Sequence, residues 1–165
     1  MREAAPDPPS GLDEKATLSA FLDWYRDVVV RKVEDLDFEQ ATRHLVSSPT
    51  TLLGIVKHLS YVERGWFQRR FIGSDAFRAP MSERIAFEFG FEDDDTVESV
   101  VAFYKQECEK SREIAAAHDL DEESRQLDSP HESLRWIMVH MVEETARHAG
   151  QMDILREQTD GATGE

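Results

Sequence analysis

Apolar residues recur at steps of three and four positions in four stretches of the chain, which is the spacing of one face of an α-helix. The stretches cover residues 13–36, 49–73, 95–118 and 129–157. No convincing strand pattern lies between them, and no internal repeat is present. The sequence therefore predicts an all-α protein, with a helix bundle as the simplest architecture.

Several residues near the predicted helix starts are typical of helix caps and first turns. Pro49 and Pro130 fall in a first turn, where the N–H group that proline lacks would have no partner inside the helix. Ser129 is the predicted N-cap of the last helix, and Asp95 opens the third one with a capping pattern.

The two ends of the chain differ from the predicted helices in composition. Residues 1–12 hold three of the six prolines, so we expect a flexible N-terminal tail. Residues 159–165 form the expected C-terminal tail. Residues 13–158 then make up a single domain, a size that can bury a substantial core.

The connection between the second and third predicted helices, residues 73–94, is too long for a tight turn. A connection of this length usually has a function or crosses over the bundle. Phe87, Phe89 and Phe91 alternate with other residues within it. We expect these rings to cover one end of the core, and a substrate lid is the alternative.

The chain of 165 residues carries 19 Lys and Arg against 34 Asp and Glu, a formal net charge of −15. This charge argues against binding to nucleic acid or to an anionic membrane. The start of the chain lacks a secretory signal, and no run approaches the roughly 20 apolar residues of a membrane span. Together with a single cysteine, Cys108, expected to be an inert core residue, these features favour a cytoplasmic protein.

The last predicted helix has polar residues in the middle of its apolar face. Steps of three and four lead from Met141 to Glu144, His148 and Gln151, and then to Leu155. An ionised carboxylate buried without a partner costs several kcal/mol, so Glu144 needs compensation if this face points inward. A hydrogen bond to histidine, a buried water, an arginine from another helix or a metal ion would each supply it.

A metal ion at this face would need a ligand from a second helix. Glu144 and His148 are one turn apart and can reach one ion together, whereas His140 lies about 12 Å of helix rise from His148. His58 stands in the middle of the second predicted helix. Alone it is typical of a histidine at the edge of a core. With Glu144 and His148 it forms a set of two imidazoles and one carboxylate that leaves coordination positions open.

Other metal schemes need spacings that the chain lacks. A di-iron bundle requires Glu-x-x-His and a zincin requires His-Glu-x-x-His, and neither is present. An open metal site could hold a thiol as thiolate or activate a water. Residues that could line its cavity or orient its ligands, with core packing as their alternative, are His140, Gln151, Trp24, Tyr25 and Trp66.

Two long runs and a closing segment together resemble a known superfamily. The runs are LLGIVKHLSYVERGWFQRR, residues 52–70, and LRWIMVHMVEETARHAGQMDILRE, residues 134–157, and the closing segment is DGATG. They are similar to the DinB-like superfamily and, within it, to the branch of mycothiol-dependent transferases. The similarity extends over all four predicted helices.

The resemblance implies a four-helix bundle with one long crossover between the second and third helices, frequently assembled as a homodimer. It also implies a divalent metal bound by His58, Glu144 and His148, with Zn²⁺ expected and Ni²⁺ or Fe²⁺ as alternatives. The implied reaction is S-transfer for detoxification or thiol-assisted isomerisation, in which a metal-activated thiol such as mycothiol attacks a small electrophile. The branch commonly has a histidine where this chain has Gln151, which leaves the role of position 151 open.

Two other functions stay open at this point. One is a non-catalytic bundle that binds a metal or a small molecule in a stress response, and the other is metal-assisted hydrolysis without a thiol. An open set of three ligands favours catalysis. However, no general base or oxyanion donor is identifiable in the sequence.

Overall fold

The computed structural model describes residues 6–76, 80, 82–126 and 131–163 of the chain. The elements are α1 (Glu14–Arg31), α2 (Phe38–Ala41), α3 (Leu52–Glu63), the π-helix η1 (Arg64–Phe71), α4 (Arg84–Phe89), α5 (Val97–Ala117) and α6 (Leu134–Asp160). The described residues form no strand, and their one isolated β-bridge joins Glu123 and Ser133. The predicted all-α class is confirmed.

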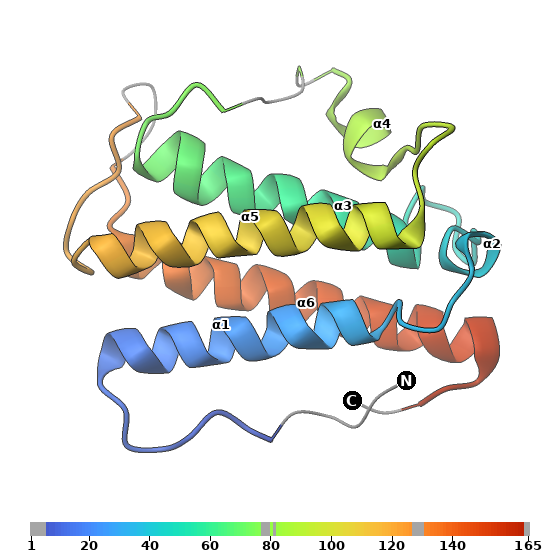
Figure 1. The fold of residues 1–165 in the computed structure, drawn as a ribbon, viewed down its shortest axis with the longest axis horizontal. Helices are drawn as coiled ribbons and strands as arrows, with labels where there is room; N and C mark the ends of the chain where they lie inside the picture. Colours follow the sequence, from blue (N-terminus) through green and yellow to red (C-terminus); the bar gives the residue numbers. More distant parts are fainter. Residues whose placement is uncertain (1–5, 77–79, 81, 127–130, 164–165) are drawn as a thin grey trace.

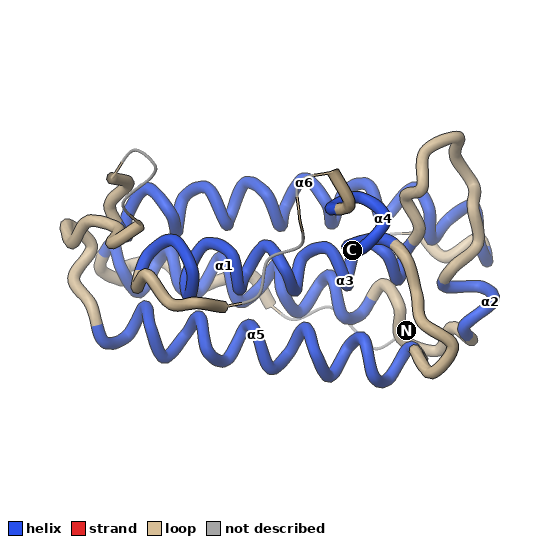
Figure 2. Tube along the Cα trace, turned by 90° about the horizontal axis from the view of Figure 1, so that it is seen from above, coloured by secondary structure: helices blue, strands red, loops and turns tan. Residues whose placement is uncertain are grey.

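The long helices α1, α5 and α6 and the continuous segment of α3 and η1 run side by side (Figures 1 and 2). Helix α1 packs mainly on α6, and α3 packs mainly on α5, while α3 and α6 are also in contact. Helices α3 and α5 run in the same direction, so the chain between them returns along the length of the helices (Figure 1). The short helix α4 lies in this connection and packs against α3.

The predicted starts of α3 and α5 are too early. Helix α3 begins after Thr51, whose side chain accepts a hydrogen bond of 3.0 Å from a first-turn N–H, so Pro49 lies before the helix. Helix α5 begins after Thr96 rather than Asp95. The Thr96 hydroxyl accepts from the Ser99 N–H, and the Ser99 hydroxyl accepts from the Thr96 N–H.

The predicted start of the last helix is wrong. Helix α6 begins at Leu134, because the Ser133 side chain accepts a hydrogen bond from the Trp136 N–H. The predicted cap Ser129 and the following Pro130 lie outside the described residues. Ser129 and Ser133 can both cap a helix, and the prediction chose Ser129 because Pro130 follows it.

Helix α1 ends at Arg31, although its apolar pattern continues to Leu36. Val33 and Leu36 are buried, so they extend the core from a turn rather than from the helix. Asp35 has a left-handed backbone conformation at this turn, with φ 64°. The pattern therefore predicts which residues are buried but not where the helix ends.

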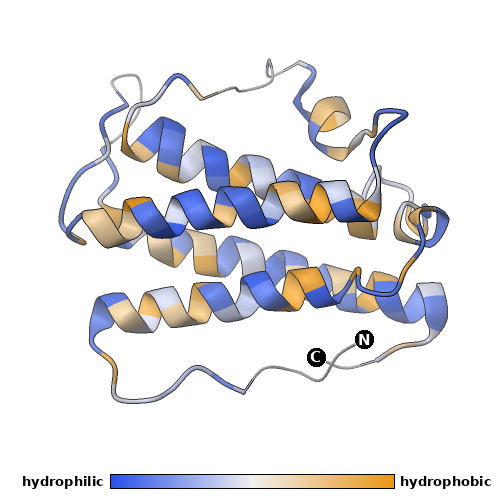
Figure 3. Ribbon diagram, in the orientation of Figure 1, coloured by the Kyte–Doolittle hydropathy of each residue, from blue (hydrophilic) through white to orange (hydrophobic). Residues whose placement is uncertain are grey.

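Two apolar clusters make up the core. The larger joins residues of α1, α3, α5 and α6, and the smaller joins α1, the end of α3, η1, α5 and the first half of α6. Along α6 the smaller cluster ends at Met141 and the larger begins at Ala149, so the polar face of this helix lies between two apolar regions. Hydrophilic and apolar residues are mixed along each long helix (Figure 3), and no helix in the described part of the chain is long and apolar enough to cross a membrane.

Two buried carboxylates fix the junction between α3 and η1. Glu63 is fully buried and accepts hydrogen bonds of 2.8 and 2.7 Å from the Arg26 guanidinium of α1. Glu107 of α5 is also fully buried and accepts from Arg64 at 3.0 and 3.1 Å and from Gln68 at 2.6 Å. Such paired hydrogen bonds between ions are geometrically specific, so they set the rotation of α3 and η1 against α1 and α5.

Aromatic residues of the predicted long connection pack onto α3. Phe89 stacks on the His58 ring at a centroid distance of 5.0 Å, and Phe87 lies 5.1 Å from the Tyr61 ring. Phe89 and Phe91 border the larger cluster, which agrees with rings that cover the core. Phe87 and Phe89 belong to the short helix α4.

Cys108 lies in the same core, on α5, with 2% of its surface exposed. Burial raises the pKa of its thiol well above the usual range, and the carboxylate of Glu63 acts in the same direction. A thiol in this state is a poor nucleophile. Cys108 is therefore an inert core residue, as expected.

We predict that Glu63→Gln destabilises the protein by about 3–5 kcal/mol, because it leaves the buried Arg26 charge with only the partly exposed Asp23 as an ion-pair partner. Urea unfolding measures the change. The matched control is Glu109→Gln on α5, which removes an exposed ion pair with Arg112 and should cost less than about 1 kcal/mol. Equal losses in the two variants would contradict a structural role for the buried pair.

Candidate metal centre

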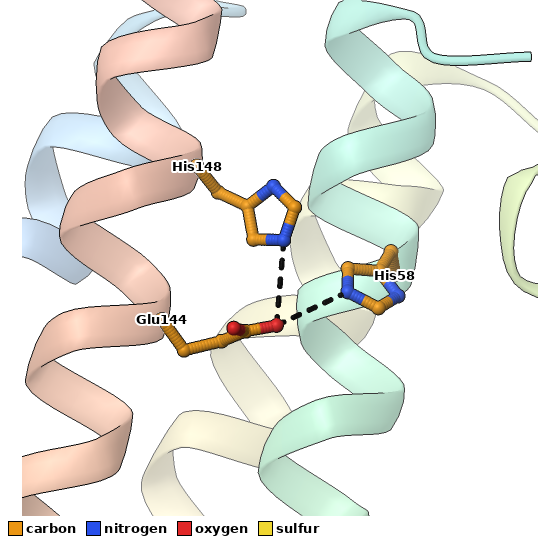
Figure 4. A group of neighbouring side chains, drawn as sticks. All are labelled: His58, Glu144 and His148. Atoms are coloured by element: carbon orange, nitrogen blue, oxygen red, sulfur yellow. Dashed lines mark ion pairs between the residues drawn. The ribbon is translucent and has the colours of Figure 1, made fainter. Parts of the chain in front are cut away.

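His58, Glu144 and His148 meet between α3 and α6 (Figure 4). His58 stands in the middle of α3, and Glu144 and His148 are one turn apart on the same face of α6. Glu144 and His148 are buried, and His58 is partly buried. The contact between the two helices therefore brings together residues that are far apart in sequence and shields them from water.

The distances in this group suit a shared ion better than direct hydrogen bonds. The Oε1 atom of Glu144 lies 3.5 Å from Nε2 of His58 and 3.4 Å from Nε2 of His148. All three ligand atoms lie within 4.8 Å of one another. Hydrogen bonds between such atoms are shorter, at about 2.7–3.2 Å. Ligands of one tetrahedral zinc ion, each about 2.0–2.1 Å from the metal, are about 3.3 Å apart.

The other nitrogen of each imidazole is held by an acceptor. His58 Nδ1 lies 2.8 Å from Oε2 of Glu88 in α4, and His148 Nδ1 lies 2.9 Å from Oε1 of Gln151. An ionised carboxylate and an amide oxygen only accept hydrogen bonds, so Nδ1 carries the proton in each neutral ring. The Nε2 lone pairs then face the Glu144 carboxylate, which is the orientation that metal-binding histidines adopt.

Glu144 has one cationic neighbour on its own helix. Its Oε2 atom accepts a hydrogen bond from the Arg147 guanidinium, while its Oε1 atom faces the two imidazoles. The Arg147 side chain is about half exposed. An arginine thus compensates part of the Glu144 charge, but it comes from the same helix rather than from another one.

Electrostatics keep the His148 ring neutral. Burial, together with the smaller effects of the nearby His58 and Arg147, lowers the pKa of His148 from 6.5 to about 4. Only a neutral imidazole has a lone pair to give to a metal. At neutral pH this ring is therefore in the form that a metal site needs.

A pocket of about 260 Å³ lies beside Glu144. Its walls come from the end of α3, from η1, α4 and α6, and from the segment before α6. The lining residues are Tyr61, Val62, Gly65, Trp66, Arg69, Arg70, Arg84, Glu88, Gln126, His140 and Glu144. The pocket is thus lined both by a candidate ligand, Glu144, and by the carboxylate that orients His58, so it is continuous with the candidate metal centre.

The residues predicted to line the cavity lie in three different parts of the structure. Trp66 and His140 line the pocket, with their rings 4.6 Å apart. Gln151 is exposed at its position on α6 but bonds the His148 ring. Trp24 and Tyr25 do not line the pocket: their rings contact each other at 5.0 Å and pack against the larger apolar cluster.

Sequence reasoning did not identify Glu88 or Arg147 as neighbours of the three residues. Glu88 lies in the long connection, for which no periodic pattern fixes a position relative to α3. Arg147 follows Glu144 by three residues on one helix, a spacing at which opposite charges interact, so the sequence did contain that signal.

The chain was also compared with models of known protein families. The profile of the mycothiol-S-transferase family matches residues 17–161. The chain belongs to the mycothiol-S-transferase family. The match covers nearly the whole of the four long helices and includes all three residues of the candidate metal centre. Comparison with curated proteins gave no match. Membership of the mycothiol-S-transferase family implies transfer reactions of the thiol mycothiol.

We predict that His148 makes the metal-free protein sensitive to acid. Its pKa is about 4 in the folded state and near 6.5 when unfolded, so stability is lost as the pH falls from 6.5 towards 4. Between pH 7 and pH 5 this contribution is about 2 kcal/mol. Urea unfolding with a chelator present should show that loss in the wild type and a smaller one in His148→Gln. An equal loss would contradict the lowered pKa.

Proposed function

We propose that the protein is a metal-dependent S-transferase in which His58, Glu144 and His148 bind a divalent metal ion. Its substrates are mycothiol and a small electrophile. The convergence of two imidazole nitrogens and one carboxylate oxygen on one point carries this proposal, because rings that are protonated at Nδ1 direct both Nε2 lone pairs to the place where a cation would bind. The match to the mycothiol-S-transferase family supports the thiol.

The donor set fits a catalytic ion rather than a structural one. Structural zinc sites are usually closed by four protein ligands, whereas three nitrogen and oxygen ligands leave a position open. Imidazole and carboxylate ligands suit Zn²⁺, with Ni²⁺ and Fe²⁺ as alternatives. When bound, such an ion supplies the positive charge that keeps a thiol deprotonated at neutral pH.

The residues of the chain position the reactants. Glu88 and Gln151 hold the two imidazoles in one orientation, so the site needs little reorganisation when it binds a ligand. The apolar clusters on both sides of Glu144 and His148 exclude water, which strengthens electrostatic interactions in the site. The adjacent pocket holds the electrophile, whose carbon is attacked by the sulfur as the leaving group departs with its electron pair.

We further infer that the four long helices form a four-helix bundle with one crossover. Helices α3 and α5 are parallel and in contact, so the segment between η1 and α5 has to return over the length of the bundle. This crossover carries α4 and delivers Glu88 to His58, and it thereby belongs to the site.

We predict that the untagged protein binds one divalent ion per chain and that His148→Ala loses it. His44→Ala is the matched control, since His44 is exposed and lies outside the centre. Elemental analysis after dialysis measures the metal. Equal metal content in the wild type and His148→Ala would contradict the proposed ligand set.

We predict that the metal-loaded protein couples mycothiol to an electrophile and that removal of the metal by a chelator abolishes turnover. Returning the metal should restore it. Mass spectrometry of the thioether product checks the reaction. Turnover at the same rate without thiol would favour the hydrolase alternative, and metal binding without any turnover would favour a non-catalytic protein.

A further inference from the structure

The pocket beside the metal centre is lined by three arginines, Arg69, Arg70 and Arg84. The chain as a whole carries a formal charge of −15, so this concentration of guanidinium groups runs against the general composition. Two of the three are already paired. Arg70 lies 3.1 Å from the Glu132 carboxylate, and Arg84 donates a hydrogen bond of 2.7 Å to Glu88.

Arg69 is the unpaired member of this group. Among the described residues its guanidinium has no hydrogen-bond or ion-pair partner, and its Nε atom is buried. A buried donor without a partner is costly, and a charged one more so. The two acidic residues of the pocket do not compensate Arg69, because Glu88 bonds Arg84 and His58, and Glu144 bonds Arg147.

Part of the remaining wall of the pocket is formed by aromatic rings. The Trp66 ring lies 4.6 Å from the ring of His140, and the Arg70 guanidinium lies 4.5 Å above Trp66. Burial lowers the pKa of His140, which keeps this ring neutral. The pocket therefore offers the unpaired Arg69 guanidinium together with the flat, uncharged rings of Trp66 and His140.

We propose that the electrophilic substrate is a small organic carboxylate, whose carboxylate binds Arg69 while its apolar body lies against Trp66 and His140. A guanidinium matches the geometry of a carboxylate and can bind it through two parallel hydrogen bonds. This inference rests on the proposed function for the reaction itself. The binding of a carboxylate in the pocket can be tested without it.

The probes are para-(bromomethyl)benzoate and its methyl ester, which differ in charge but share the reactive carbon. With mycothiol, a carbon–sulfur bond forms, the carbon–bromine bond breaks, bromide leaves with the electron pair, and the thiol proton is released. Arg69→Gln should raise the KM for the carboxylate about ten-fold or more and leave the KM values for the ester and for mycothiol unchanged. Arg69→Lys keeps the charge and should have a smaller effect.

Calorimetric titration with para-methylbenzoate, which has no leaving group, measures binding directly. Arg69→Gln should weaken this binding about ten-fold or more, whereas Arg43→Gln, an exposed arginine outside the pocket, should not change it. Thermal unfolding checks that the variants fold, and the loss of an unpaired arginine should not lower the Tm.

Each outcome distinguishes the two proposals. If neither electrophile reacts with mycothiol but para-methylbenzoate binding depends on Arg69, the proposed function fails and the carboxylate site stands. If both electrophiles react and Arg69→Gln changes neither the KM of the carboxylate nor para-methylbenzoate binding, the carboxylate inference is overturned. A raised KM for mycothiol alone would also overturn it, because the pocket would then hold the thiol.

Discussion

Mutual repulsion among electron-rich atoms is the constraint on which the architecture of this site depends. Two imidazole nitrogens and a carboxylate oxygen lie within 4.8 Å of one another in a buried place, with both rings held by acceptors on their far side. When both rings are protonated at Nδ1 alone, no proton lies between these atoms to relieve the repulsion. A cation in the centre, as we propose, would relieve this repulsion.

The frame around the centre is built from ion pairs rather than from apolar packing alone. Helix α3 ends five residues after His58, at Glu63, which accepts hydrogen bonds from Arg26. The π-helix η1 begins at the next residue, Arg64, which donates hydrogen bonds to Glu107. These pairs fix the rotation of α3 and so the direction of His58. The π-helix that follows turns its side chains by smaller steps than an α-helix does, and this is the segment that lines the pocket with Trp66 and Arg69.

The helices and the three residues of the candidate metal centre could be predicted from the sequence, because both depend on regular spacing. Period 3.6 predicts which face of each helix is buried, and the same period brings Glu144 and His148 to one face of α6. The link between His58 and that face was weaker, since it depends on how two helices pack; the family resemblance supplied it. Glu88 and Arg69 had no such signal, because one lies in a long connection and the other in a π-helix.

Local competition explains the errors in the predicted boundaries. Ser129 and Ser133 are equally able to cap a helix, and the structure uses Ser133. Asp35 ends the α1 region in a left-handed turn although the apolar pattern continues. The aromatic pair Trp24 and Tyr25 shows a related limit: helical spacing identifies rings near the core but does not distinguish the wall of a pocket from packing.

X-ray absorption spectroscopy of the metal-loaded protein tests the central claim most directly. We predict a first shell of nitrogen and oxygen at about 2.0–2.2 Å with the scattering pattern of two imidazoles. Addition of mycothiol should add a sulfur neighbour at about 2.3 Å. A shell without imidazole, or one unchanged by His58→Gln, would show that these three side chains do not share an ion.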